Sequence, residues 1–230
     1  MLRKLWAPSP FCHARANSPL DMIVVHHIGS KNSKLYSASG AITWFIDEEV
    51  HRNKDTGKIE NKVSAHYVLP RAVYKDSDVV HLVKDSDVAY HAGNSQWTVD
   101  GKLRKGINSY SVGIELEGDG NLVEYTDFQY ENLIQIVREL MNTYRIREEN
   151  IVGHEDIAPG RKVDPGRLFD WKRFRKGINP PPIIEMPELA ITPPEEEAPM
   201  FHMEAGEDKK SRIGGLLGGI LSLVFKLLGK

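Results

Sequence analysis

The stretch SVGIELEGDGNLVEYTDFQYENLIQIVRELMNTY, at residues 111–144, predicts a β-strand followed by a long amphipathic helix. Its first part, SVGIELEG, has the composition of a strand. Thr126 and Gln129 have the spacing of a capping box, in which each side chain bonds to the other residue's backbone N–H at the start of a helix. Apolar residues then recur at helical spacing, at Tyr130, Leu133, Val137, Leu140, Met141 and Tyr144.

Further strands and helices alternate on both sides of this stretch. Strands are predicted where short apolar runs occur, at residues 22–26, 65–70, 79–83 and 151–154. Helices are predicted at residues 38–50 and 169–178. This alternation predicts an α/β fold with a central mixed β-sheet flanked by helices, in a single domain over residues 1–178.

Composition narrows the class of protein. Of 230 residues, 40% are hydrophobic and 27% are charged, which is typical of a globular chain and excludes disorder throughout. The net charge of -2 argues against a generally basic nucleic-acid binder. Cys12 is the single cysteine, so the fold is held by its core or by a metal and not by an intrachain disulfide. The N-terminus lacks the apolar core of a secretory signal, which predicts synthesis in the cytoplasm.

The last 52 residues differ in composition from the rest of the chain. Residues 179–208 hold eight acidic residues, no lysine or arginine, and seven prolines, which predicts an extended linker. Residues 209–230 hold five basic residues around a long apolar run, a pattern typical of a cationic amphipathic helix that binds anionic membrane lipid. The uninterrupted apolar core, residues 213–225, is short for a membrane-spanning helix. Docking of this segment on the domain or on a partner is the alternative.

Three groups of side chains have the chemistry of metal ligands and follow predicted strands. They are His26 or His27, then His154, then Asp164. Two imidazoles and one carboxylate are typical of a catalytic zinc site, because three protein ligands leave a fourth position open. The spacing alone matches no short helical metal motif, so these residues leave a structural or solvated role open.

Five motifs occur in the order and approximate spacing of one family. They are VVHHIGS at 24–30, SAHYVL at 64–69, AYHAG at 89–93, SVGIELEG at 111–118 and GHEDIAPGRKVDPG at 153–166. Over roughly residues 20–178 the chain resembles the type 2 N-acetylmuramoyl-L-alanine amidases, a family that includes AmpD-like amidases, phage lysozyme-type amidases and peptidoglycan recognition proteins. The resemblance implies an α/β zinc hydrolase that cleaves the amide between N-acetylmuramic acid and L-alanine in peptidoglycan.

The resemblance also implies a role for single residues. His26, His154 and Asp164 match the family's Zn²⁺ ligands, with aspartate at the third position as in the AmpD-like branch. His27 follows a ligand on a strand, so its side chain is expected on the opposite face. Glu115 matches the catalytic acid/base, although Glu117 shares its face of the strand.

Three more residues match family motifs. Lys162 matches the lysine that supports the developing oxyanion. His66 and His91 lie in family motifs and are expected to line the substrate site, with a structural role as the alternative for each.

Residues 209–230, called the tail below, decide which biological role the sequence favours. A cationic membrane-binding segment on a spacer favours a phage-type endolysin or other lytic amidase, which acts on the cell wall in the periplasm after release. A cytosolic AmpD-like amidase that recycles muropeptides is the alternative. A peptidoglycan-binding module without activity is an alternative of another class, although such a module has no need for the full set of ligands and Glu115.

Overall fold

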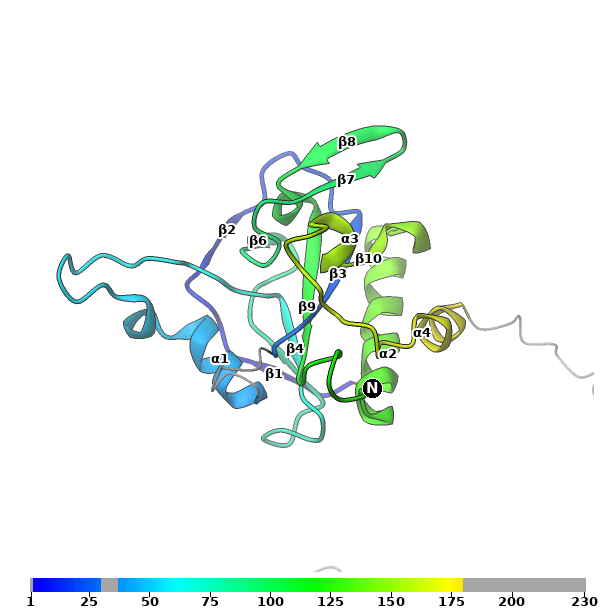
Figure 1. Ribbon diagram of the computed structural model, residues 1–230, viewed down its shortest axis with the longest axis horizontal. Helices are drawn as coiled ribbons and strands as arrows, with labels where there is room; N and C mark the ends of the chain where they lie inside the picture. Colours follow the sequence, from blue (N-terminus) through cyan, green and yellow to red (C-terminus); the bar gives the residue numbers. More distant parts are fainter. Residues whose placement is uncertain (1, 30–36, 180–230) are drawn as a thin grey trace, which may run out of the picture. The chain divides into compact units, whose positions relative to one another are not determined.

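The computed structural model describes residues 2–29 and 37–179. Within these residues, a six-stranded sheet lies at the centre and helices cover both of its faces (Figure 1). The strands lie in the order β1 (Lys4–Trp6), β5 (Val79–His81), β4 (Tyr67–Leu69), β9 (Ser111–Leu116), β3 (Met22–His27) and β10 (Ile151–Gly153). Only β5 and β4 pair antiparallel, so the sheet is mixed, as predicted. The predicted linker from residue 180 and the predicted tail lie outside the described residues.

The long helix predicted from the capping box is confirmed as α2 (Asp127–Tyr144). The Thr126 Oγ1 accepts from the Gln129 backbone N at 3.2 Å, and the Gln129 Oε1 accepts from the Thr126 backbone N at 3.1 Å. With α4 (Trp171–Ile178), α2 covers one face of the sheet. The apolar core on this face includes Ile23, Val25, Tyr67, Val112, Ile114, Leu133, Val137, Leu140, Phe174 and Ile178.

The opposite face is covered by α1 (Ala38–Ile46) and, near β3 and β10, by the short α3 (His154–Ile157). The helix predicted over 38–50 is too long, because the chain changes direction at Asp47. The Asp47 backbone N–H donates to Thr43 O and its carboxylate accepts from the Glu49 backbone N. This second bond starts a separate 3₁₀ turn, Glu48–His51.

Two small antiparallel pairs were not predicted. The strand β2 (Cys12–Ala14) pairs with β6 (Asp87–Ala89), and β7 (Gln96–Val99) forms a hairpin with β8 (Lys102–Lys105). Asp100 and Gly101 form the hairpin turn, both with positive φ. An Asp-Gly pair is a known hairpin-turn signal and could have indicated the turn between β7 and β8 from the sequence.

Four strands of the sheet present their carboxyl ends at one edge. The strands β4, β9, β3 and β10 run parallel, so their carboxyl ends meet at one edge, where open α/β sheets bind ligands. Along β3, Met22 and Val24 pack in the core beside α3, and His26 continues the same face. Among the described residues, no helix has the length and apolar character that crossing a bilayer requires.

Candidate active site

Three buried ligand-type side chains converge at the carboxyl edge of the sheet. His26 is the second-last residue of β3, His154 is the first residue after β10, and Asp164 lies in the loop beyond α3. The Nδ1 atoms of His26 and His154 are 2.9 Å apart, and each lies 3.0 Å from the Asp164 Oδ2. Exposed fractions are 1%, 1% and 5%. The parallel pairing of β3 with β10 explains how residues so far apart in sequence meet.

The loop that carries Asp164 is fixed on both sides. The Glu155 backbone N donates to the Asp164 backbone O at 2.9 Å, and the Tyr125 hydroxyl donates to Pro165 O at 2.7 Å. Gly120 has no side chain where the loop passes, and a Cβ there would overlap Pro165 O. Because backbone and side-chain bonds both restrain it, the Asp164 carboxylate is held against the two imidazoles.

Burial and the contacts between the three side chains set the charges of this cluster. It lowers the pKa of His26 to about 4, so the imidazole is neutral at pH 7. Burial alone would raise the pKa of Asp164, but the neighbouring His154 and His26 hold it well below its ordinary value. The cluster is therefore two imidazoles and one carboxylate, the donor set that the sequence predicts to bind a metal ion.

Glu115 is placed directly beside this cluster. It is the register partner of His26 across β9 and β3. Its Oε2 is buried and has no hydrogen-bond partner among the described residues. Burial, with the charge of Asp164, raises the pKa of Glu115 to about 8, while Lys162 acts to lower it. A carboxyl group in this state can take up and release a proton near neutral pH.

Glu117 shares the strand face in the sequence pattern but has a different environment. The strand β9 ends at Leu116, and the Glu117 Oε2 accepts from the Arg71 backbone N at 2.8 Å. Its carboxylate thus fixes the loop after β4. The structure therefore separates the two glutamates, which periodicity could not do.

Lys162 lies in the loop between α3 and Asp164, with its backbone N–H donating to Ala158 O. It is partly exposed, and its charge lowers the pKa of both Glu115 and His26. A positive side chain is therefore near both the carboxyl group and the histidine.

His27 is directed away from the cluster. Its Nδ1 accepts from the Gly120 backbone N at 3.0 Å, and it lies 3.5 Å from the Asp119 carboxylate. It therefore orders the loop after β9, beside the loop of Asp164, and leaves the converging position to His26.

The two remaining motif histidines are both engaged with protein atoms. His66 is 0% exposed, with Nδ1 accepting from the Gly113 backbone N and Nε2 donating to Asp87 O. His91 contacts the His26 Nε2 through Nδ1, at 2.9 Å, and Ser111 Oγ through Nε2. Neither ring has a nitrogen left for a substrate in this arrangement, which favours the structural alternative for both. Sequence patterns contain no signal that singles out Ser111.

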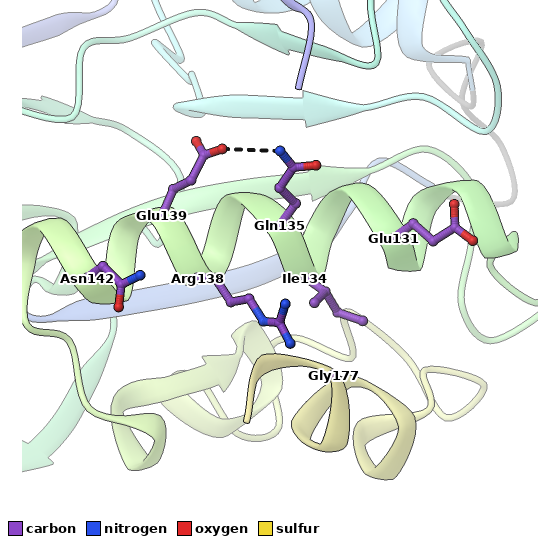
Figure 2. Close-up of a pocket in the computed structure, with 7 residues that line it drawn as sticks. All are labelled: Glu131, Ile134, Gln135, Arg138, Glu139, Asn142 and Gly177. Carbon is purple, nitrogen blue, oxygen red and sulfur yellow. Dashed lines mark hydrogen bonds between the residues drawn. The ribbon is translucent and has the colours of Figure 1, made fainter. Parts of the chain in front are cut away.

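A hollow lies between α2 and α4 (Figure 2). It is lined by Glu131, Ile134, Gln135, Arg138, Glu139, Asn142 and Gly177. The helix α2 packs on the sheet face opposite to that of His26, so this hollow is separate from the cluster. Its Gln135 and Glu139 bond to each other, and Glu139 also pairs with Lys4. None of the residues that line this hollow belongs to the histidine cluster.

Comparison with known proteins places this geometry in a family. The family model for N-acetylmuramoyl-L-alanine amidases matches residues 16–167. The 1,6-anhydro-N-acetylmuramyl-L-alanine amidase AmpD of Escherichia coli K12 is 36% identical over 176 residues, 75% of this chain and 90% of AmpD.

Solved structures agree with that match. The crystal structure of a selenomethionine AmpD derivative matches with a TM-score of 0.62 and 33% identity, over 78% of this chain and 96% of that one. The E. coli amidase AmiD, in complex with anhydro-N-acetylmuramic acid-L-Ala-D-γ-Glu-L-Lys, matches with a TM-score of 0.53 and 28% identity, over 71% and 60% of the two chains. The chain therefore belongs to the N-acetylmuramoyl-L-alanine amidase family.

Proposed function

We propose that this amidase cleaves the lactyl–L-alanine amide of small muropeptides, including those that end in 1,6-anhydro-N-acetylmuramic acid. The main support is the match to AmpD over 90% of that protein's length. The AmiD complex, with an anhydromuramoyl peptide, supports the same substrate class. This is the recycling alternative of the sequence analysis, and the comparisons favour it over the endolysin that the sequence favoured.

His26, His154 and Asp164 are proposed to hold Zn²⁺. Ligand atoms around tetrahedral zinc lie about 3.4 Å apart, given metal–ligand distances of about 2.1 Å. The separations of 2.9 to 3.0 Å among the three ligand atoms are slightly shorter, so a small outward movement fits the ion. His154 Nε2 contacts the Ala92 carbonyl at 3.1 Å and must donate to it, so its Nδ1 presents a lone pair to the centre. The donor set and its spacing thus fit zinc.

Zinc bound there would polarise the scissile carbonyl and lower the pKa of a water molecule. Glu115 would accept a proton from the attacking water and return it to the leaving amine of L-alanine. Lys162 would place positive charge beside the oxyanion. Hydrolysis of the amide then yields a free muramoyl carboxylate and a peptide with a free amino terminus.

One observation carries the catalytic assignment. The Glu115 Oε2 is buried and lacks a hydrogen-bond partner in the described part of the chain, and Glu115 lies opposite His26 in the sheet register. A purely structural glutamate would be paired at such a place. A module that only binds peptidoglycan would have no use for it.

The test is mass spectrometry of anhydromuropeptide digests, scoring new L-alanine amino termini. We expect release by the zinc-loaded wild type, its loss after chelation, and its recovery on adding zinc. Glu115→Gln should bind zinc and lose at least about a hundredfold in rate, as is usual for removal of an acid/base group. Glu117→Gln is the matched control and should remain active. A Glu115→Gln protein with the wild-type rate would refute the assigned role.

The sequence of residues 209–230 supports a second candidate, a lytic role at the wall of an intact cell. The family match ends at residue 167, so this cationic apolar segment lies beyond it. We propose that the segment binds anionic lipid. Deletion of residues 209–230 should abolish sedimentation with anionic vesicles and leave cleavage of soluble muropeptides unchanged. Equal sedimentation of both proteins would reject lipid binding through the tail. Cleavage of intact sacculi at a rate close to that of fragments would favour the lytic role.

A further inference from the structure

We propose that His91 and Ser111 are positioning residues that keep the Nδ1 lone pair of His26 directed at the metal position. The inference rests on the proposed role of His26 as a zinc ligand. Three side chains, those of His26, His91 and Ser111, form a hydrogen-bonded chain that ends on the backbone carbonyl of Ile107. Neither His91 nor Ser111 touches the reacting atoms.

The chain of contacts runs inward from β9. Ser111 Oγ donates to Ile107 O at 2.8 Å, His91 Nε2 lies 3.2 Å from Ser111 Oγ, and His91 Nδ1 lies 2.9 Å from the His26 Nε2. A carbonyl oxygen only accepts, so the single hydroxyl proton of Ser111 is used at Ile107. The Ser111 oxygen must then accept from the His91 Nε2–H.

This direction fixes both rings. A neutral imidazole has one N–H and one acceptor nitrogen, so a donor at His91 Nε2 makes His91 Nδ1 an acceptor. His91 therefore accepts from the His26 Nε2–H, and the His26 Nδ1 keeps its lone pair. The reverse direction would place a proton on the His26 Nδ1, between the ligand atoms, and would leave Ile107 O without the hydroxyl. Outer bonds of this kind orient metal-binding histidines.

The fold leaves room for the His91 ring at one position. Gly113 lies between Ser111 and Glu115 on the same face of β9, and a Cβ there would overlap the His91 ring. Asn108 Oδ1 accepts from the His91 backbone N at 3.1 Å and from the Ala92 backbone N at 2.7 Å. The position of His91 is thus fixed from the ring side and from the backbone side.

Ala92, the residue after His91, orients the imidazole of His154. Ala92 O accepts from the His154 Nε2 at 3.1 Å and from the Arg161 guanidinium at 2.9 Å. The side chain of residue 91 and the carbonyl of residue 92 therefore direct the Nδ1 atoms of His26 and His154 to a common point. Replacement of the His91 side chain should therefore change the orientation of His26 more than that of His154.

The first experiment reads the tautomers directly. Wild-type protein with ¹⁵N-labelled histidine, metal-free and zinc-loaded, is examined by long-range ¹H–¹⁵N NMR, with signals assigned through His91→Asn. We expect His26 and His91 to carry their protons on Nε2 in both states. A His91 proton on Nδ1 in the wild-type protein would overturn the inference.

The second experiment measures zinc affinity by competition with a chromophoric chelator. His91→Ala should weaken zinc binding about 10- to 100-fold, the usual effect of losing a partner of a metal ligand. Ser111→Ala should weaken it in the same direction. His91→Asn should retain more affinity than His91→Ala, because an amide oxygen can take the place of the Nδ1 acceptor.

A matched control separates this effect from general loss of packing. Ser9 is a buried serine whose hydroxyl bonds only to the backbone of Phe45 and Phe11 within the described residues, away from the cluster. Ser9→Ala should lower the unfolding midpoint and leave zinc affinity unchanged. If folded His91→Ala and Ser111→Ala bind zinc as tightly as the wild type, the positioning role is wrong but the proposed function stands. A wild-type protein that fails to bind zinc would overturn the proposed function as well.

Discussion

Replacement of Glu115 by glutamine should stabilise the metal-free protein at alkaline pH while it removes activity. Burial raises the pKa of Glu115 from 4.5 to about 8. The folded protein therefore binds a proton between these values that the unfolded chain has released. Because the native state binds more protons, its stability falls as the pH rises from about 4.5 to about 8 and then levels off. Glutamine has no such charge.

The magnitude follows from the interval between the two values. One pKa unit is worth about 1.4 kcal/mol, so the interval from 4.5 to about 8 gives an upper limit of about 5 kcal/mol. Partial access of water to the carboxyl group reduces this, and we expect a gain of about 2 to 4 kcal/mol for Glu115→Gln at pH 9. At pH 4 the two proteins should have nearly the same stability.

The assay is urea unfolding of metal-free protein between pH 4 and pH 9, followed by circular dichroism. Buried histidines such as His26 contribute their own pH dependence, with stability lost as pH falls below their unfolded pKa, but wild type and variant share it. The difference between the two curves therefore isolates Glu115. Glu117→Gln should leave the curve in place. A difference in unfolding free energy between wild type and Glu115→Gln that is constant with pH would refute the reasoning. Bound zinc should reduce the difference, since a nearby cation favours the carboxylate.

Three other perturbations test other parts of the molecule. Thr126→Ala removes the capping box of α2 and should lower the free energy of unfolding by about 1 kcal/mol with unchanged activity, as measured by urea unfolding and muropeptide cleavage. Gly113→Ala should displace the His91 ring and weaken zinc binding in the chelator competition, and a wild-type affinity would contradict the packing argument. Asp164→Asn should lose zinc retention on gel filtration, whereas Asp156→Asn, which alters only a carboxylate bonded to the Gly153 backbone, should keep it.

Elements that depend on local pattern could be predicted from the sequence. The helix α2 follows from Thr126, Gln129 and the apolar spacing, and β3 follows from its β-branched run. The position of His26, His154 and Asp164 after strands, with the family resemblance, also indicated residues that the fold brings together. These inferences succeeded because capping and side-chain periodicity act over a few residues.

Features that depend on distant partners could not be predicted. The strand β1 exists because Lys4–Trp6 pairs with β5, more than seventy residues further along the chain, and three residues carry too little pattern to show it. His66 and His91 occupy similar motif positions, and only the structure shows which protein atoms each ring contacts. Side-chain periodicity likewise left Glu115 and Glu117 equivalent; the family resemblance favoured Glu115, and the structure shows Glu117 bonded to the Arg71 backbone.

The strand β9 shows how one segment serves both the core and the site. Val112, Ile114 and Leu116 point to the α2 face and are buried in its apolar core, whereas Ser111, Gly113 and Glu115 alternate with them on the other face. On that second face, Ser111 ends the histidine chain and Gly113 leaves space for the His91 ring. Glu115 presents a carboxyl oxygen that has no hydrogen-bond partner within residues 2–29 and 37–179. A register slip of one residue would place Glu115 against α2 and an isoleucine or leucine beside His26. The packing of the apolar face therefore fixes the register on which the proposed chemistry depends.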